Sequence, residues 1–423
     1  MEIELRYGKQ NLIVTMPEKC VSVIAQQETK TLENEIQEIR NALRDPINSK
    51  PLREITKSND SVVIVFSDIT RPVPYKTIMP VILDELGEIP NEQILLMNAL
   101  GTHRKNTDQE LLDLLGPEAF NGYEIHQHDC DDEDNLLYLG KSKNNTKILI
   151  NRLYCQADVR ILTGFIEPHL FAGFSGGPKA VLPGIAGRET IHVNHGPGMI
   201  GSPNAGFGIT GGNPIWEEMM EVALIKEPTF LVNTTQTPDG EITGIFAGDL
   251  EEAHQAGVQH TIQSAMVSVD KEFDIVIVTP GGYPFDINLY QAVKGMAVAA
   301  NIVRDGGSII LVAECIEGLP EYGGYADVLE SSRSPKELLR KITTEEISMQ
   351  DQWDAQIQAM ICNRVRTFIY SDGLSDDEIK KAFGVPCRDI NELINDLLDE
   401  KADQTRIAVM PHGPQSIPYI EKK

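Results

Sequence analysis

Short runs of β-branched and other apolar residues alternate along this chain with longer segments whose apolar positions recur every three or four residues. Residues 61–66, SVVIVF, are the first clear run, and such runs are typical of strands buried on both faces of a parallel sheet. Residues 31–44, TLENEIQEIRNALR, show the helical spacing. Because the alternation continues toward the C-terminus, the pattern predicts an α/β fold with mostly parallel sheets.

The expected elements follow this pattern along the whole chain. Residues 1–17 alternate like a pair of strands. Further strands are predicted at residues 93–100, 123–129, 147–154, 157–163, 229–235, 241–246, 273–278, 308–313, 366–371 and 406–411. Helices are predicted at residues 75–86, 106–115, 213–225, 250–266, 288–303, 335–342, 350–363, 376–383 and 390–400.

The length of 423 residues exceeds the usual size of a domain with a single hydrophobic core, so two domains are expected. A new strand–helix alternation begins at residue 273 after a long helix, which places the boundary near residues 267–272. The expected domains are therefore residues 1–268 and 269–423, and the tail from about residue 412 could pack back on the first domain.

Charge and cysteine usage exclude several classes of protein. A formal charge of -26 argues against nucleic acid or an anionic membrane surface as a partner, because nothing would offset the repulsion. The first residues lack a signal-peptide pattern, and no run of about 18 apolar residues occurs, so a cytoplasmic location is expected. The six cysteines lack CxxC spacing, which favours buried reduced thiols over a zinc ribbon or a disulfide framework.

Polar groups follow several of the predicted strands. Asp68 and Arg71 come after the strand at residues 61–66, and His103 follows the next strand. Ligands of open α/β sheets bind beyond the carboxyl ends of strands, so these side chains are candidates for a site. A capping aspartate, a surface arginine and a hydrogen-bonded structural histidine are the alternative interpretations.

A loop rich in glycine and proline occupies residues 164–195 and contains His169, Lys179 and His195. Glycine and proline at this density fix loop geometry and let the backbone approach a ligand. The turn Ser175-Gly176-Gly177 could bring backbone N–H groups to a phosphate, and Lys179 alone could be a phosphate binder or a salt-bridge partner.

Other histidines are expected to be structural or exposed. His192 precedes His195 by three residues and is expected to be structural, whereas His254 and His260 are expected on the surface of a long helix. His126 and His128 lie beside an acidic run and look like a solvated strand edge rather than a metal site.

In the second domain, a helix begins shortly after the strand at residues 273–278. Tyr290 and Lys294 stand one turn apart on it, and Gln291 adjoins them. This helix therefore presents a phenol, an amide and a cation near its start.

Five of these segments together resemble the nickel-pincer-nucleotide-dependent lactate racemase family. They are FSDITRPVP (66–74), LGTHR (100–104), EPHLFAGFSGGPKAVLPGIAG (167–187), IHVNH (191–195) and LYQAVKG (289–295). Five separated motifs in one order are more specific than any single motif. The resemblance implies a two-domain α/β racemase with its active site in the cleft between the domains.

The resemblance also implies roles for individual residues. The cofactor would be nickel held by a pyridinium-3-thioamide-5-thiocarboxylic acid mononucleotide, attached covalently to Lys179, with His195 as the protein ligand to nickel. Both of these residues lie in the first domain. His103 and His169 would be the acid–base pair, and separate cofactor-synthesis proteins would be needed for maturation. The remaining implied contacts are Asp68, Ser175, Gly176, Gly177, Tyr290 and Gln291 to the cofactor, and Arg71, Lys294 and Trp353 to the substrate.

Inverting a 2-hydroxy acid requires the kinds of groups that the resemblance implies. Removing a proton from C2 would place a carbanion beside a carboxylate, whereas hydride transfer gives a planar keto acid that can be reduced on either face. That route needs an electron-poor ring, a base for each enantiomer's hydroxyl and cations for the carboxylate.

Lactate is therefore the first expected substrate, and malate, 2-hydroxyglutarate, longer aliphatic acids and sugar acids are alternatives. A protein that binds a nucleotide or phosphate without the pincer cofactor is a third interpretation. The early strands carry no GxGxxG, so a conventional dinucleotide site is unsupported.

Overall fold

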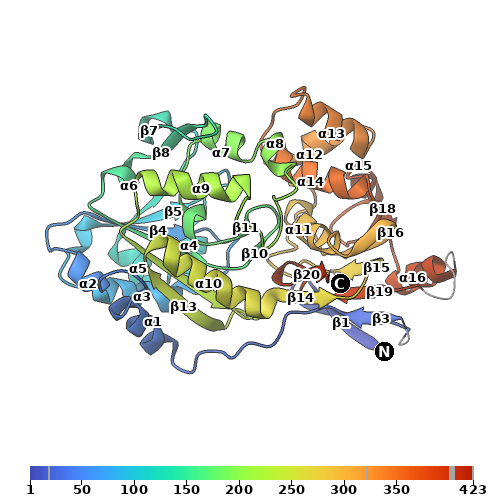
Figure 1. The fold of residues 1–423 in the computed structure, drawn as a ribbon, viewed down its shortest axis with the longest axis horizontal. Helices are drawn as coiled ribbons and strands as arrows, with labels where there is room; N and C mark the ends of the chain where they lie inside the picture. The colour runs from blue at the N-terminus through green and yellow to red at the C-terminus, as the bar shows by residue number, and fades with distance from the viewer. Residues whose placement is uncertain (18–19, 321–322, 400–404, 422–423) are drawn as a thin grey trace. The chain divides into compact units, whose positions relative to one another are not determined.

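The computed structural model describes residues 1–423 except 18–19, 321–322, 400–404 and 422–423. The chain forms two compact units, of which unit 1 comprises Met1–Gln27 and Ser264–Lys423, and unit 2 comprises Glu28–Gln263. Figure 1 shows the elements of both units. The mixed α/β architecture with mostly parallel sheets confirms the predicted fold class.

Unit 2 is built on a six-stranded sheet with the order β13-β12-β9-β4-β5-β6. All neighbouring strands are parallel except the pair β12–β13. From β4 the chain moves outward through β5 to β6, and from β9 it moves the other way to β12. The strand order therefore reverses between β4 and β9, and such a reversal leaves a crevice beyond the carboxyl ends of the two strands. The strands are β4 (Val62–Ser67), β5 (Ile94–Ala99), β6 (Glu124–Gln127), β9 (Val159–Phe165), β12 (Phe230–Gln236) and β13 (Ile242–Gly248).

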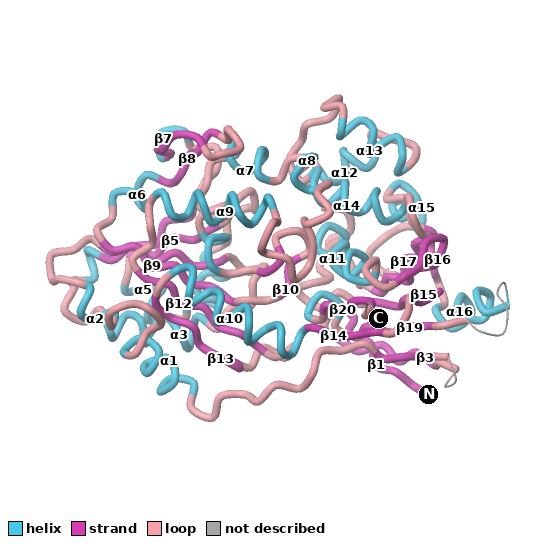
Figure 2. The backbone as a smooth tube through the Cα atoms, in the orientation of Figure 1, coloured by secondary structure: helices cyan, strands magenta, loops and turns pink. Residues whose placement is uncertain are grey.

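Helices cover both faces of this sheet. Buried residues of α1 and α3, such as Leu43 and Ile78, pack with Ile64 and Ile161 of the strands in one continuous core. In Figure 2, α1 and α3 lie on one side of the strands and α9 lies on the other. The helices of unit 2 are α1 (Glu35–Arg44), α2 (Leu52–Ile55), α3 (Tyr75–Glu85), α4 (Asp108–Leu115), α5 (Pro117–Gly122), α6 (Arg152–Gln156), α7 (Arg188–Asn194), α8 (Pro197–Ile200), α9 (Pro214–Ile225) and α10 (Leu250–Ala265), the last of which ends in unit 1.

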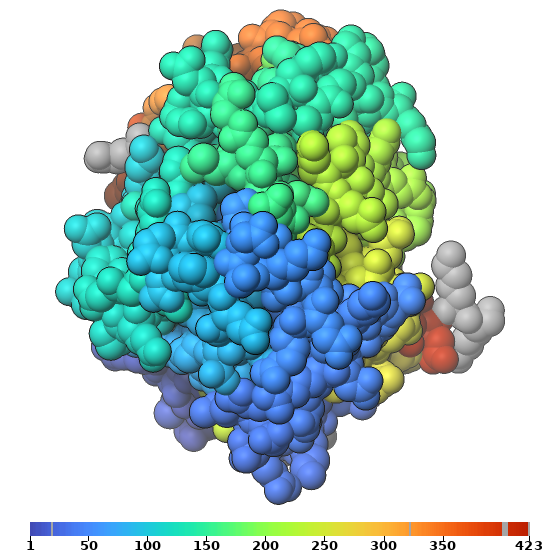
Figure 3. All heavy atoms as spheres, turned by 90° about the vertical axis from the view of Figure 1, so that its left-hand side faces the viewer, coloured from blue at the N-terminus to red at the C-terminus, as the bar shows by residue number. Residues whose placement is uncertain are grey.

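Two segments near the start of unit 2 form hydrogen bonds with β13, the strand at one edge of the sheet. The backbone N–H of Leu32 donates to Ile242 (2.9 Å), and that of Ile47 donates to Ala247 (2.8 Å). In Figure 3 the blue residues near α1 accordingly lie beside yellow-green residues from the end of the unit. Shorter elements are the hairpin β7 (Leu136–Lys141) with β8 (Lys147–Asn151), the pair β10 (Pro168–His169) with β11 (Gly173–Phe174), and the 3-10 turn η3 (Gly177–Ala180).

An ion-pair cluster fastens α3 to the beginning of the unit. The carboxylate of Glu85 is fully buried and accepts hydrogen bonds from Nε of Arg44 (2.9 Å) and Nε of Arg53 (2.6 Å). Arg40 adds a third contact at 3.4 Å. Three cations around one buried carboxylate compensate its desolvation, so Glu85 is a structural residue.

Unit 1 contains a second six-stranded sheet, with the order β18-β17-β16-β15-β19-β3 and all strands parallel. Its strands are β3 (Val21–Val23), β15 (Phe273–Val278), β16 (Val303–Val312), β17 (Arg366–Tyr370), β18 (Val385–Cys387) and β19 (Ile407–Met410). Its helices are α11 (Leu289–Ala299), α12 (Tyr325–Glu330), α13 (Pro335–Thr343), α14 (Gln352–Cys362), α15 (Asp376–Lys381) and α16 (Ile390–Asp399).

The first 27 residues belong to unit 1, which differs from the expected first domain of residues 1–268. The hairpin of β1 (Glu2–Tyr7) and β2 (Gln10–Thr15) buries Leu5 and Val14 against strands β15, β16 and β19, and β3 pairs with β19. These apolar contacts explain why the N-terminal segment joins the later part of the chain. The tail also stays within unit 1, because β20 (Ile417–Ile420) pairs with β14 (Met266–Val269).

Candidate active site

The reversal point of the unit 2 sheet brings Asp68 and His103 together. Asp68 follows β4 and His103 follows the neighbouring strand β5, so both side chains stand at the carboxyl edge of the sheet. The distance between Asp68 Oδ2 and His103 Nδ1 is 2.5 Å. The Asp68 carboxylate is 4% exposed and the His103 imidazole 29%, so the pair has a buried acid and a histidine that reaches solvent.

The surroundings of Asp68 keep its carboxyl group ionised. Burial alone favours the neutral form, but it is outweighed by the charge and hydrogen bond of His103, by the hydroxyl of Thr70 and by the charge of Arg71. Together these groups lower the pKa of Asp68 to about 2. An ionised Asp68 accepts the Nδ1 proton of His103, which leaves Nε2 of His103 as the proton-accepting nitrogen.

Arg71 lies beside this pair. Its guanidinium donates to the carbonyl of Thr70 (Nη1–O 3.4 Å), and its charge acts on Asp68. The side chain is half-buried. A guanidinium at this position can hold a carboxylate near His103.

The loop after β9 folds over the ends of β4 and β9. Gly176 and Gly177 both have positive φ values, and a Cβ on Gly176 would lie 2.5 Å from Asn233 Oδ1, so the loop needs glycine there. The loop is also tied to that of His103, because Gly101 N donates to Gly184 O (2.9 Å) and Gly184 N donates to Lys179 O (3.1 Å). The segment carrying Lys179 therefore lies next to the segment carrying His103.

The turn before Lys179 uses part of its backbone internally. Ser175 N donates to Glu167 O (2.9 Å), and Gly177 N donates to Asn233 Oδ1 (2.8 Å). The Ser175 hydroxyl is likewise engaged with Phe165 O at 2.9 Å. The N–H groups of Ser175 and Gly177 are therefore hydrogen-bonded within the protein in this structure, and a phosphate contact of the turn stays a prediction.

Phe171 gathers three of the predicted residues around one aromatic ring. Its centroid lies 4.6 Å from the imidazole of His169 and 5.0 Å from that of His195, both in edge-on geometry. Lys179 Nζ stands 5.5 Å from the same centroid. The two imidazoles and the amine, which come from one glycine-rich segment, thus surround a common apolar side chain that was not among the predicted site residues.

His195 is almost completely buried at the end of α7. Burial, followed by the nearby charge of Lys179, lowers its pKa well below 6.5, so the imidazole is neutral and can bind a metal. Burial, followed by the charge of Arg188, also lowers the pKa of His192. The choice of His195 over His192 as the candidate ligand stays a prediction. Within the described parts of the chain, no group of three or more His, Cys, Asp or Glu side chains is arranged to hold a metal.

His169 has the opposite hydrogen-bonding arrangement to His103. The backbone N–H of Ala172 donates to His169 Nδ1 at 3.3 Å, which assigns the ring proton to Nε2. His169 is 6% exposed. One candidate histidine therefore presents a basic Nε2 and the other an Nε2–H.

Unit 1 carries the remaining predicted residues on α11 and α14. Lys294 Nζ donates to Oε1 of Gln291, and Trp353 Nε1 donates to the hydroxyl of Tyr290 at 3.2 Å. Burial, together with the charges of Asp351 and Asp354, raises the pKa of Tyr290 well above 10, so the phenol stays protonated. The four predicted residues of unit 1 thus form two hydrogen-bonded pairs.

His254 was expected on the surface, and this expectation is wrong. Its side chain is buried, and Nε2 donates to Ser175 O at 2.9 Å. Burial lowers the pKa of His254 to about 4, so it is neutral. Its helical spacing with Gly257 and Thr261 could have indicated an inward face. His128 is also buried rather than solvated, with Nε2 3.0 Å from Ala186 O.

The fold and the site together define a two-unit α/β protein with candidate polar residues at the reversal point of a mostly parallel sheet. Two family models match the chain, the lactate racemase N-terminal domain over residues 7–208 and the lactate racemase C-terminal domain over residues 268–417. The chain belongs to the lactate racemase family, a family of isomerases, which confirms the resemblance of its motifs.

Individual relatives agree with this assignment. The chain is 34% identical over 419 residues to a lactate racemase of Thermoanaerobacterium thermosaccharolyticum, with 97% of both proteins covered. It is 35% identical over 420 residues to a lactate racemase of Lactiplantibacillus plantarum, covering 97% of this chain and 98% of the relative.

Solved structures support the fold. The lactate racemase apoprotein of Thermoanaerobacterium thermosaccharolyticum superposes with a TM-score of 0.92 at 32% identity, covering 100% of each chain. A Thermotoga maritima protein of 18% identity shares the fold, with a TM-score of 0.74 and coverage of 93% of this chain and 100% of that one.

Proposed function

We propose that this protein racemises a small 2-hydroxy acid, with lactate as the first candidate, by proton-coupled hydride transfer. The observation that carries the proposal is the pair of candidate histidines with opposite proton positions at Nε2, His103 paired with Asp68 and His169 paired with Ala172. The names of the two curated relatives support lactate as the substrate.

The residues around Phe171 fit the cofactor that the motifs imply. Lys179 would carry the pyridinium nucleotide through its amine, and His195 would be the protein ligand to nickel, since its imidazole is buried and neutral. When bound, this cofactor supplies an electron-poor ring that accepts a hydride from C2 and returns it to either face. Phe171 would exclude water from this region, because its ring packs against both imidazoles.

His103 acts as the base for one enantiomer. Its Nε2 takes the hydroxyl proton as C2 becomes a planar ketone carbon, and the Asp68 carboxylate stabilises the imidazolium that results. His169 donates a hydrogen bond from its Nε2–H to the keto oxygen when reduction occurs from the other face, and the proton held on His103 Nε2 returns to that oxygen. Both imidazoles are then neutral again, so the reaction neither gains nor loses a proton.

Cations would hold the substrate carboxylate. We assign this role to Arg71 and Lys294, with Gln291 orienting Lys294 and with Tyr290 and Trp353 lining the site. The charges of Asp351 and Asp354 act on Tyr290, so a second carboxylate there would be repelled. This arrangement favours lactate over malate and 2-hydroxyglutarate.

The proposal includes the setting of the reaction. All six cysteines are free thiols, which fits a cytoplasmic location. Among the described residues, no helix has the length and apolar character needed to cross a membrane. Cofactor-synthesis proteins would act on Lys179 during maturation.

Intact mass and nickel content of protein made together with cofactor-synthesis proteins test the proposal. We expect a nucleotide-sized adduct with nickel in the wild-type protein, interconversion of D- and L-lactate, and loss of the adduct in Lys179→Ala. His195→Ala should keep the adduct and lose nickel.

Two results would contradict the proposal in different ways. A fully loaded protein that leaves lactate and a panel of other 2-hydroxy acids unconverted would exclude the racemase. Absence of any adduct in cells that load a known relative would favour a nucleotide- or phosphate-binding protein without this cofactor.

A further inference from the structure

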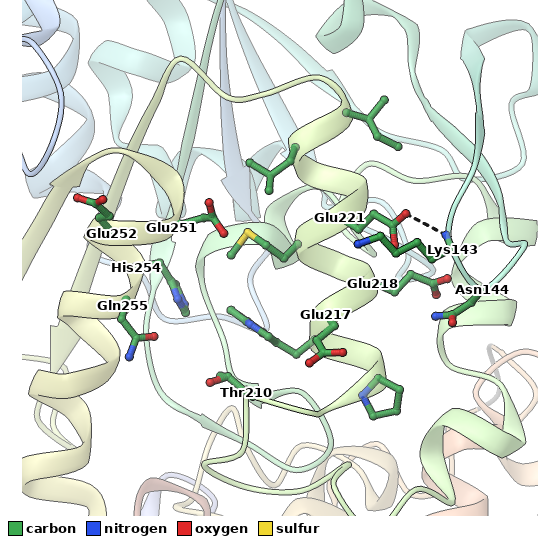
Figure 4. A pocket seen from close by; sticks show the side chains of 16 residues that line it. Lys143, Asn144, Thr210, Glu217, Glu218, Glu221, Glu251, Glu252, His254 and Gln255 are labelled. Carbon is green, nitrogen blue, oxygen red and sulfur yellow. Dashed lines mark hydrogen bonds between the residues drawn. The ribbon is translucent and has the colours of Figure 1, made fainter.

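A groove of about 1120 Å³ lies between α9 and α10 in unit 2. Figure 4 shows Glu217, Glu218 and Glu221 on α9 at one side, and Glu251, His254 and Gln255 on α10 at the other. None of the residues assigned to the reaction lines this groove. The groove is therefore lined by residues separate from those assigned to the reaction.

The floor of the groove is an apolar strip along α9. Trp216, Met220 and Leu224 stand at intervals of four residues and all line the groove, with Ile225 at its end. Eight residues of helix span about 12 Å, or slightly more than two turns. Ile225 is 39% exposed, so the strip reaches solvent. An apolar row of this length matches one face of a short amphipathic helix.

The rim of the groove is acidic. Glu217 and Glu221 flank the strip on α9, and Glu251 and Glu252 face it from the start of α10. Glu217 accepts from Gly212 N (2.8 Å), but a neutral amide leaves its charge uncompensated. Within the described part of the chain, Glu251 and Glu252 form no ion pair, and Lys143 is the cation among the lining residues.

We infer that this groove docks a basic amphipathic helix of a partner protein. Apolar side chains of that helix would cover Trp216, Met220 and Leu224, and its lysines or arginines would meet the glutamates of the rim. The charge of -26 disfavours a second copy of this chain as the occupant. A single metal ion fits poorly, since the described residues contain no group of three or more His, Cys, Asp or Glu suited to hold one.

The groove lies behind the turn that precedes Lys179. The Trp216 indole packs on the His254 imidazole, with centroids 4.9 Å apart, and His254 donates to Ser175 O. A Cβ on Gly177 would lie 2.5 Å from the His254 ring, so ring and turn are in close contact. A helix seated on Trp216 would therefore contact the side chains that support this turn.

Fluorescence anisotropy with a labelled 18-residue peptide of leucine and lysine, arranged with one leucine face, tests the inference. We expect saturable one-to-one binding that weakens at least tenfold in the double variant Glu251→Lys/Glu252→Lys. The matched control Glu88→Lys/Glu92→Lys makes the same change of charge at exposed sites outside the groove and should alter binding less than twofold.

Two further measurements separate the other occupants. Leu224→Asp removes part of the apolar strip while adding negative charge, and we expect it to weaken the peptide at least fivefold. Spermine, a small polycation, should not displace the peptide at equal charge concentration, and light scattering should show no self-association through the groove.

Several results would overturn the inference. Peptide binding could be weakened equally by the groove pair and the control pair, or Leu224→Asp could leave peptide binding unchanged or make it tighter. Spermine could displace the peptide, or the protein could form a dimer that Glu251→Lys/Glu252→Lys dissociates. Circular dichroism of each variant checks that the fold is retained, and the two groove variants perturb different helices.

Discussion

Replacing Asp68 by asparagine tests whether its carboxylate acts through His103. The pKa of Asp68 falls from 3.8 to about 2 despite burial. At about 1.36 kcal/mol per pKa unit, this difference corresponds to about 2 kcal/mol, or roughly 30-fold in a rate constant. We therefore expect Asp68→Asn to lower kcat/KM of the loaded enzyme by between about ten- and a hundredfold.

A double-mutant cycle with His103→Asn isolates the pair. If Asp68 acts only by orienting and stabilising His103, Asp68→Asn should have little further effect once His103 is replaced. The ¹⁵N chemical shifts of the His103 ring in the apoprotein report the proton position without any cofactor. We expect the Nδ1–H form in the wild type and a mixture of tautomers in Asp68→Asn.

If Asp68→Asn kept more than half of the activity with an unchanged His103 tautomer, Asp68 would not act through His103. Stability gives an independent check with a defined sign. Because the folded-state pKa is lowered, the stabilisation by Asp68 is present above about pH 3.8 and is lost as the pH falls through about 2. The variant should therefore be destabilised at pH 7, and the difference should shrink in acid.

Three other perturbations follow from the structure. Gly173→Ala should lower the free energy of unfolding by more than about 2 kcal/mol, because φ is +81° and the new Cβ would lie 2.3 Å from Ile209 O. Gly240→Ala, with φ of +87° and open space around the new Cβ, should cost only about 1 kcal/mol of backbone strain. Equal losses of stability for the two variants in urea titrations would contradict this contrast. Glu85→Gln should cost about 3 kcal/mol by the same titrations, since it removes the charge that compensates three arginines, and a change below 1 kcal/mol would show that the cluster is not stabilising. Burial raises the pKa of four thiols to about 11, namely those of Cys130, Cys155, Cys362 and Cys387. These thiols should therefore react slowly with iodoacetamide at pH 7.5 until urea exposes them. Rapid labelling of these cysteines in the native protein, located by peptide mass mapping, would argue against their burial.

Much of the fold could be predicted because buried parallel strands leave a strong local signal. The run at residues 61–66 becomes β4, and the run at residues 273–278 becomes β15. The reversal of strand order between β4 and β9 has no such signal, since it depends on pairing between distant segments. The placement of the N-terminal hairpin in unit 1 was missed for the same reason.

The site was predictable where chemistry and position coincide. Asp68 and His103 follow adjacent strands, and the structure joins them by a hydrogen bond. Phe171 was missed because an apolar residue in a glycine-rich loop carries no sign that two imidazoles and an amine will surround it. Asn233 and His254 were missed because they support the loop from distant elements.

The discontinuity of unit 1 has a consequence for the order in which the protein can fold during synthesis. Unit 2 is one uninterrupted segment, so it can fold as soon as Gln263 has left the ribosome. The hairpin of β1 and β2 precedes unit 2 in the chain but must wait for β15, β16 and β19, the strands that bury Leu5 and Val14. Until those strands emerge, a nascent chain carries an exposed apolar hairpin joined to a finished domain, and a chaperone that binds such surfaces would recognise this hairpin.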